Sequence, residues 1–72
     1  MAGYQDPRRY IRLAAELRER ITAGELIAGD RISITDEVER HGVGRTTARR
    51  ALLMLSGEGR VRRYPGIGYV VL

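Results

Sequence analysis

The segment from Val43 to Gly59 most constrains the fold of this chain, because it reads as one helix that has both an apolar face and a polar, cationic N-terminal end. Its apolar side chains recur with the spacing of a single helix face, which has to pack against a core. Its first two turns are polar and cationic instead, and they consist of Arg45, Thr46, Thr47, Ala48, Arg49 and Arg50. A helix that is anchored on one face and carries arginine and threonine at its N-terminal end has the form of a major-groove reading helix. The alternative is a surface helix with solvated arginines.

The residue types at that cationic end suit contacts to DNA. An arginine guanidinium can fork onto guanine O6 and N7, and threonine can bond bases or phosphates or touch a thymine methyl group. Just before this helix, Gly42-Val43-Gly44 predicts a tight turn from a preceding short helix. The sequence therefore predicts helix-turn-helix geometry.

Charge is divided unevenly along the chain. Residues 1–40 carry seven arginines against eight acidic residues, whereas residues 41–72 carry six arginines against Glu58 alone. A basic half on a small domain indicates a polyanionic partner, most often nucleic acid. A membrane surface is the rival, but there is no basic amphipathic helix with a Trp/Phe/Leu face. No apolar run approaches the roughly 20 residues that a membrane span needs, so we expect no membrane partner and a cytoplasmic protein.

Size and composition argue against an enzyme or a metal protein. The 72 residues predict a single domain spanning 1–72, with no cysteine and one histidine, His41. We therefore expect no metal and no cofactor, and we expect His41 to be a partly buried packing residue. The serines Ser33 and Ser56 lie at predicted helix ends without a nearby histidine, which is not a nucleophile–base pattern. A chain this short is also expected to lack volume for a small-molecule pocket of about 300 Å³ or more.

The first half of the chain predicts a helix, a short strand and a second helix. Residues 1–5 are expected to fray, and Asp6-Pro7 is a good start for a helix that runs to about Ala23. One face of that helix is apolar and comprises Tyr10, Leu13, Ala14, Leu17 and Ile21. A loop over 24–30 leads to Arg31-Ile32, a candidate third strand of a small sheet. Either Ser33 or Thr35 caps the second helix, which Gly42 ends.

The last segment predicts a β-hairpin. Residues 60–64 and 69–72 are β-prone and flank the turn sequence Pro65-Gly66-Ile67-Gly68. Alternation places Val61 and Arg63 on one side and Arg62 and Tyr64 on the other. A basic hairpin beside a reading helix is a wing, whose tip lies on DNA backbone or enters the minor groove. A phosphate-binding loop is the alternative for Gly66-x-Gly68, but no helix follows it.

Taken in order, these pieces resemble the winged helix-turn-helix DNA-binding domain of the GntR family of bacterial transcription regulators. The resemblance runs from about Tyr10 to Val71. It is carried by Tyr10-x-x-Leu13-Ala14-x-x-Leu17-x-x-x-Ile21, Gly24-Glu25-Leu26-x-x-Gly29-Asp30-Arg31-Ile32, Gly42-Val43-Gly44-Arg45-Thr46-Thr47-Ala48-Arg49-Arg50-Ala51-Leu52, Leu55, Glu58-Gly59 and Pro65-Gly66-x-Gly68-Tyr69-Val70. It implies an α+β fold in the order helix, strand, helix, helix, strand, strand, with a small antiparallel sheet.

The resemblance also implies a DNA-binding site. Arg45 and Arg49 correspond to the family's reading-helix arginines, and Gly66 corresponds to its wing-tip glycine at the minor groove. We expect Arg45 and Arg49, in a recognition helix over about 45–56, to read bases, each worth about 1–3 kcal/mol of discrimination. The other expected contacts position the recognition helix on the DNA, or bind the wing, residues 60–72, to phosphate groups. They are Thr46, Thr47, Arg50, Arg62 and Arg63 from those two elements, with Thr35 and Arg9 from the first half of the chain.

The chain departs from the family pattern at several positions. Gly44 replaces the usual Ser or Thr cap, Ala48 replaces a bulkier residue, and Thr35 stands where an arginine often contacts DNA. Family members also carry a C-terminal effector and dimerisation domain, so this chain is interpreted either as an excised domain or as a stand-alone regulator. The expected partner is double-stranded DNA, a pseudo-palindromic operator bound by a homodimer, in the bacterial cytoplasm at the nucleoid. The alternative is a winged-helix module that binds protein instead of DNA.

Overall fold

Residues 7–72 are described by the computed structural model, and they form three helices and three strands. The elements are α1 (Pro7–Thr22), β1 (Arg31–Ile32), α2 (Ile34–His41), α3 (Arg45–Gly57), β2 (Val61–Tyr64) and β3 (Gly68–Val71). This order and the antiparallel strand pairing confirm the predicted α+β winged helix-turn-helix fold. The predicted frayed terminus over residues 1–5 and the predicted cap Asp6 lie outside the described residues.

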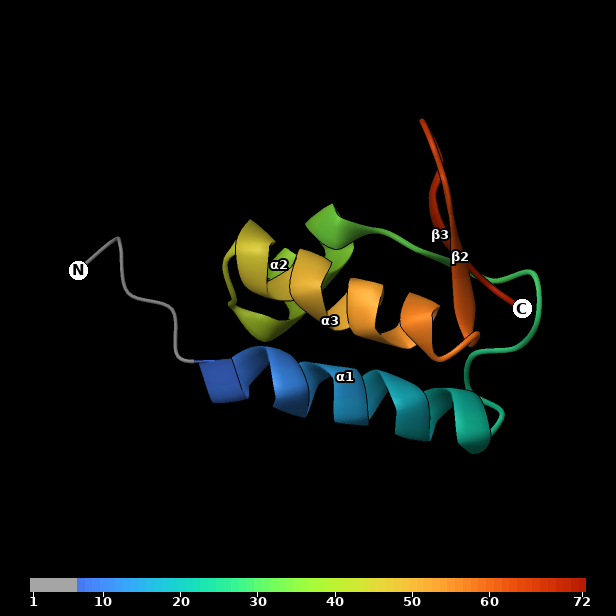
Figure 1. Cartoon of the computed structure of the whole chain (residues 1–72), viewed down its shortest axis with the longest axis horizontal. Coiled ribbons are helices and arrows are strands. Elements are labelled where there is room, and N and C mark those ends of the chain that lie inside the picture. Colours follow the sequence, from blue (N-terminus) through green and yellow to red (C-terminus); the bar gives the residue numbers. More distant parts are fainter. Residues whose placement is uncertain (1–6) are drawn as a thin grey trace.

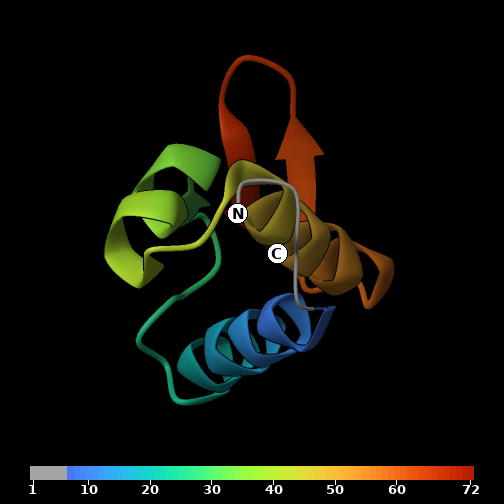
Figure 2. The ribbon, with the colours of Figure 1, turned by 90° about the vertical axis from the view of Figure 1, so that its left-hand side faces the viewer.

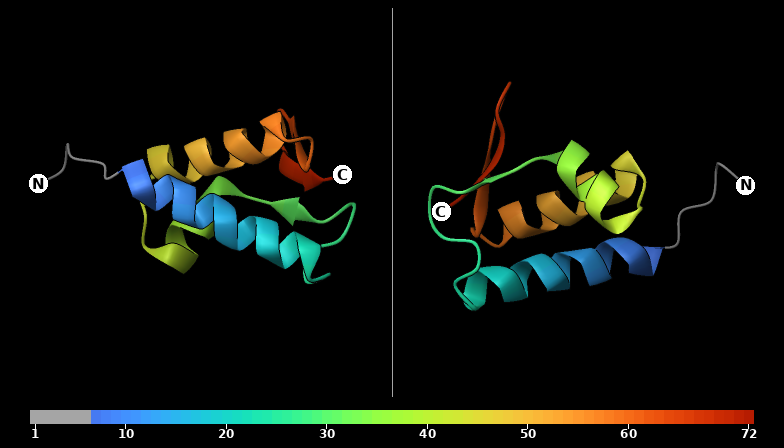
Figure 3. Two further views of the ribbon diagram at one scale, coloured as in Figure 1. Left: turned by 60° about the horizontal axis from the view of Figure 1, so that its bottom comes forward. Right: turned by 180° about the vertical axis from the view of Figure 1, so that it is seen from behind.

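Helices α1 and α3 lie side by side along most of their length (Figures 1 and 3). The predicted apolar face of α1 is the one that packs, with Leu13, Ala14 and Leu17 buried and Tyr10 and Ile21 half-buried. The helix ends one residue before the predicted boundary. Its last turn closes with a backbone bond from Glu25 N–H to the Arg20 carbonyl and one from Gly24 N–H to the Ile21 carbonyl, the pattern of a Schellman motif.

The short helix α2 begins and ends at predicted positions. Of the two candidate caps, Ser33 is the one that acts, because its Oγ accepts a hydrogen bond from Asp36 N–H at 3.0 Å. Gly42 ends the helix, with its N–H bonded to the Val38 carbonyl. Residues 42–44 then turn the chain directly into α3, which completes the helix-turn-helix.

Helix α3 starts without a side-chain cap, as expected from Gly44 at the N-cap position. It ends one residue later than the sequence predicts, and its last turn also has the Schellman pattern: Arg60 N–H bonds the Leu55 carbonyl and Gly59 N–H bonds the Ser56 carbonyl. This tight ending leads into β2 within a few residues, so the strand begins beside the C-terminal end of the helix.

The sheet has β3 in the centre, between β1 and β2, with antiparallel pairing on both sides. The expected contribution of Arg31-Ile32 as a third strand is confirmed. Figure 2 shows the β2–β3 hairpin standing clear of the helices, with its turn at the far end. That turn has Pro65 at its second position, Gly66 with φ +80° at its third, and a bond from Ile67 N–H to the Tyr64 carbonyl. These features define a type II turn, in which the third position favours glycine.

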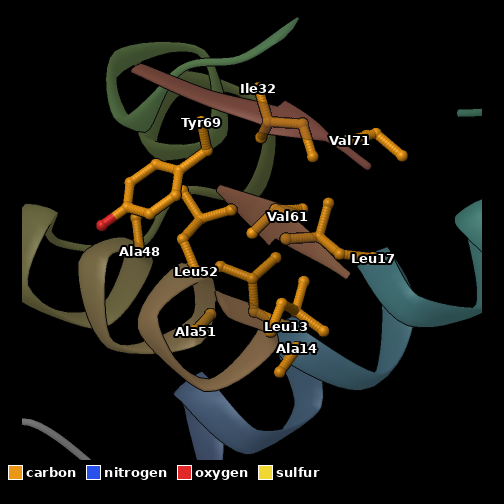
Figure 4. Packing of buried hydrophobic residues seen from close by; sticks show 11 residues of the cluster. Leu13, Ala14, Leu17, Ile32, Ala48, Ala51, Leu52, Val61, Tyr69 and Val71 are labelled. Atoms are coloured by element: carbon orange, nitrogen blue, oxygen red, sulfur yellow. The ribbon is translucent and has the colours of Figure 1, made fainter. Parts of the chain in front are cut away.

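The core lies where α1, α3 and the sheet meet, as seen in Figure 4. Fully buried side chains come from α1 (Leu17), α3 (Leu52 and Leu55) and β2 (Val61). Tyr69 of β3 and Ala48 of α3 are both buried members of this cluster, and Figure 4 draws the Tyr69 ring next to Ala48.

Candidate nucleic-acid interface

Helix α3 presents two stripes on separate faces. Ala48, Ala51, Leu52 and Leu55 form its buried face. Arg45, Arg49 and Leu53 recur every four residues on another face, and all three are exposed and line one groove. Burial of the first stripe fixes the rotation of the helix, and that rotation is what turns the two arginines outward.

The groove between α3 and the hairpin has a volume of about 610 Å³. One wall is the N-terminal half of α3 together with Ile34 and Thr35 at the start of α2. The opposite wall is the hairpin, with residues 63–69, and Arg31 of β1 also lines it. Four arginines among the described residues share this lining, namely Arg31, Arg45, Arg49 and Arg63, and no acidic residue appears in it. A concave surface with this charge attracts an anionic backbone.

Two helices hold Arg45 at the groove. Its Nη1 donates a hydrogen bond to Thr35 Oγ1 at 3.2 Å, across the turn of the helix-turn-helix. Both side chains line the groove. Thr35 therefore lies beside the predicted base-reading arginine, and it helps to orient a side chain that would otherwise lose more rotamer freedom on binding.

On the hairpin, the predicted alternation is present. Val61 and Arg63 pair with Val71 and Tyr69, so these side chains share the face that turns toward the core, and Arg63 lies where this face leaves the core and meets the groove. Arg62 pairs with Val70 on the opposite face and does not line the groove. Of the two predicted wing arginines, Arg63 is therefore the one that the sheet directs toward α3. Gly66 also lines the groove.

Thr47 requires a correction. The sequence reading placed it with Thr46 on the DNA-facing surface, but it is buried, with 3% of its surface exposed, whereas Thr46 is exposed. Thr47 lies one helical turn before Ala51, so it continues the buried stripe of α3. That spacing was visible in the sequence. A side chain in this position cannot contact an external duplex without a change in packing.

Two other predicted residues lie outside the groove lining, near the N-terminal end of α1. The Arg50 guanidinium lies over the Tyr10 ring, with its carbon 5.7 Å from the ring centre. Arg9 Nη2 donates to the Gly42 carbonyl at 3.3 Å and so ties α1 to the end of α2. Both arginines are exposed and both engage the protein itself.

Several lining residues were not predicted as site residues, and among them are Arg31, Leu53 and Tyr64. Leu53 and Tyr64 are exposed apolar side chains, with 52% and 39% of their surface accessible. Leu53 follows Arg49 by one helical turn, so its position was available from the helical period. No local sequence pattern could have predicted that Arg31 lines the groove, because its contact there is with Ile67, 36 residues later in the chain.

The opposite end of α3 carries an ion-pair cluster. Glu58 accepts hydrogen bonds from Arg18 Nη2 at 2.6 Å and from Arg60 Nε at 2.9 Å. The bond from Arg18, followed by that from Arg60, lowers the pKa of the Glu58 carboxyl from 4.5 to about 2, while desolvation acts in the other direction. The same pairing raises the pKa of Arg18. The cluster connects α1 to the segment between α3 and β2.

His41 is half-buried, as predicted, and its ring lies between two carboxylates. Nδ1 is 3.3 Å from Glu16 of α1, and Nε2 is 3.1 Å from the buried Glu37 of α2. The approach to Glu37 is short, but it lacks the direction of a hydrogen bond. Within residues 7–72 no group of three or more His, Asp or Glu side chains could hold a metal ion.

A second hollow of about 460 Å³ lies beside His41, between α1 and α2, and Glu19, Arg20 and Arg40 also line it. This volume exceeds about 300 Å³, so the expectation that a chain of this length has no room for a pocket of that size was wrong. The absence of a small-molecule ligand stays a prediction. None of the described helices is long and apolar enough to span a membrane.

Comparison with known proteins places this geometry in a family. A sequence model described as "Bacterial regulatory proteins, gntR family" matches residues 9–71. The chain belongs to the GntR family. Among curated GntR-type relatives, the Exu regulon transcriptional regulator of Escherichia coli K12 is 42% identical, and the same-named protein of Shigella flexneri gives the same value. Each match covers 93% of this chain and 27% of the relative. The chain thus spans about a quarter of the length of these GntR relatives.

Solved structures have the same fold. A crystal structure of AraR(DBD) in complex with operator ORR3 superposes with a TM-score of 0.84 at 25% identity, over 89% of this chain and 78% of that one. A transcriptional regulator from Oenococcus oeni superposes with a TM-score of 0.82 at 22% identity, over 99% of this chain and 60% of that one. The winged-helix arrangement of this GntR-family chain is therefore shared with proteins of low sequence identity.

Proposed function

We propose that this chain binds double-stranded DNA sequence-specifically, as the DNA-binding part of a bacterial transcription regulator. The observation that carries the proposal is the shared groove: Arg45 and Arg49 of α3 and Arg63 and Gly66 of the wing line a single concave surface. The likeness to AraR, whose structure was solved with operator DNA, supports it.

The groove suits one sugar–phosphate strand. A reading helix occupies the major groove, which is about 12 Å wide, and the wing contacts the neighbouring minor groove or backbone. The strand that separates the two DNA grooves then passes between α3 and the hairpin, where Arg31 and Arg63 of the lining lie close enough to neutralise its phosphates. In this arrangement Arg45 and Arg49 reach base edges, Thr35 orients Arg45, and Arg63 and the Gly66 backbone contact phosphate.

Thr46 and the side chains outside the groove have secondary roles in this proposal. Thr46 is exposed on the first turn of α3 and contacts flanking phosphate. Arg9, Arg50 and Arg62 add long-range attraction, because each is exposed but directed away from the groove. Thr47 is omitted. A single copy of so small an interface binds weakly, so two copies act together on a two-fold operator, in the bacterial cytoplasm.

The test compares two arginines of equal charge. A duplex enriched from a random pool by the wild-type chain is titrated against its scrambled version at several salt concentrations. We expect Arg49→Ala to reduce the preference for the enriched duplex by about 1–3 kcal/mol. Arg40→Ala removes the same charge from the hollow beside His41, and the preference should be unchanged.

Two outcomes would contradict this proposal. If Arg49→Ala weakens both duplexes equally, Arg49 contacts phosphate and its base-reading role is wrong. If the wild type shows no salt-dependent binding to any duplex, the groove serves a protein partner instead.

A further inference from the structure

Arg31 joins two segments that are far apart in the sequence. Its Nε donates a hydrogen bond to the carbonyl of Ile67, in the wing turn 36 residues later. Both residues line the groove between α3 and the hairpin. The bond therefore fixes the far end of the hairpin to β1, which the chain connects directly to α2.

The backbone at the base of the turn leaves room for this contact. Gly68 has φ +119°, and a Cβ there would lie 3.2 Å from the Ile32 carbonyl oxygen and 3.6 Å from Arg31 Nε. The Arg31 side chain thus passes along β3 at a point without a side chain. The pairing of Arg31 with Val70 sets its starting point, and the bond to Ile67 sets its end.

The wing turn has little else to hold it at this position. Pro65, Gly66 and Ile67 are exposed, and Figure 2 shows the turn standing away from the helices. Turns of this kind open locally at low free-energy cost. A charged donor on a turn carbonyl opposes that opening more strongly than a neutral donor does.

We propose that Arg31 is a positioning residue, which holds the wing turn in the position, relative to α3, in which it contacts the DNA backbone. The effect of Arg31 on DNA affinity rests on the proposed function. The ordering of the turn is a property of the free protein and is tested separately. With Arg31 in place, the chain binds DNA with the wing already ordered, so less entropy is lost on association.

The deciding variant is Arg31→Lys, because lysine keeps the charge but has a methylene where arginine has Nε. In the free protein, we expect the Ile67 amide, which bonds Tyr64, to exchange its hydrogen about tenfold faster than in wild type. Amides in the middle of α3 should keep their wild-type rates, which shows that the fold is intact. Arg62→Lys, on the other side of Val70, is the matched control and should leave Ile67 exchange unchanged.

With the enriched duplex, we expect Arg31→Lys to bind several-fold more weakly while the dependence of binding on salt keeps its wild-type slope, since no charge is lost. Wild-type exchange at Ile67 in Arg31→Lys would overturn the proposal. Faster exchange with unchanged affinity would also overturn it, because the turn would then not matter for binding. If the wild type binds no duplex, the proposed function fails, while the exchange rates still report whether Arg31 orders the turn.

Discussion

The rotation of α3 can be tested with two adjacent leucines. Leu52 is fully buried, with 0% of its surface exposed, whereas Leu53 is 52% exposed and lines the groove. Leu52→Ala removes three carbons, worth about 2.4 kcal/mol at about 0.8 kcal/mol for each. The cavity that remains raises the loss toward about 5 kcal/mol. A domain of this length has about 4–11 kcal/mol in total, so we expect Leu52→Ala to be close to unfolding.

Leu53→Ala is the matched variant, with the same chemical change one residue away. We expect it to cost less than about 1 kcal/mol, because much of the side chain already contacts water and alanine is the better helix former. Urea unfolding followed by circular dichroism measures both variants. At a slope of about 1 kcal/mol per molar urea, their midpoints should differ by about 1.5 M or more.

The result also bears on the DNA-binding proposal. Arg45 and Arg49 lie eight and four residues before Leu53, so the three share one helix face, and that face lines the groove only if α3 is rotated as described. Equal destabilisation by Leu52→Ala and Leu53→Ala would refute this rotation. The assignment of the two arginines to the groove would then be refuted with it.

Three further predictions concern local contacts. The free-energy advantage of wild type over Glu58→Gln should be constant above about pH 5 and shrink as pH falls from 4.5 toward 2, because the folded-state pKa of Glu58 is depressed to about 2 beside Arg18; urea unfolding across this range checks it. Ser33→Ala should lower the free energy of unfolding by about 0.5–2 kcal/mol, since it removes the cap on Asp36 N–H, whereas Ser33→Thr should retain most of it. Gly66→Ala should cost about 1–2 kcal/mol, because alanine is strained at φ +80°, and thermal unfolding measures the loss.

Much of the fold was predictable because its determinants are local. The apolar face of α1, the Ser33 cap and the Pro65-Gly66 turn each depend on residues within a few positions of one another. The candidate site was predictable where it follows the same periods, as for Arg45 and Arg49 on α3 and for Arg63 on β2. Thr47 was misplaced because its residue type was given more weight than its position one turn before Ala51.

Contacts between distant segments were beyond a reading of local pattern. Arg31 reaches Ile67 only because β1 pairs with β3. A strand of two residues is too short to show an alternating pattern that would define its partner strand. The burial of Glu37 and the position of His41 beside Glu16 of α1 depend in the same way on the tertiary arrangement. In both cases the residue type was typical of a solvated surface, and the tertiary arrangement gave it a specific neighbour.

The separation of the wing from α3 follows from the junction at the end of the helix. Residues 58–60 lead from α3 into β2, and the bond from Arg60 N–H to the Leu55 carbonyl fixes their path. Glu58 then ties this junction to α1 through Arg18. Because the hairpin extends from a fixed base and Arg31 holds its far end, the distance across the groove is set at both ends before any duplex is present. A preformed groove of this kind favours one spacing between the reading helix and the backbone, so discrimination against distorted duplexes should come from the scaffold as well as from base contacts.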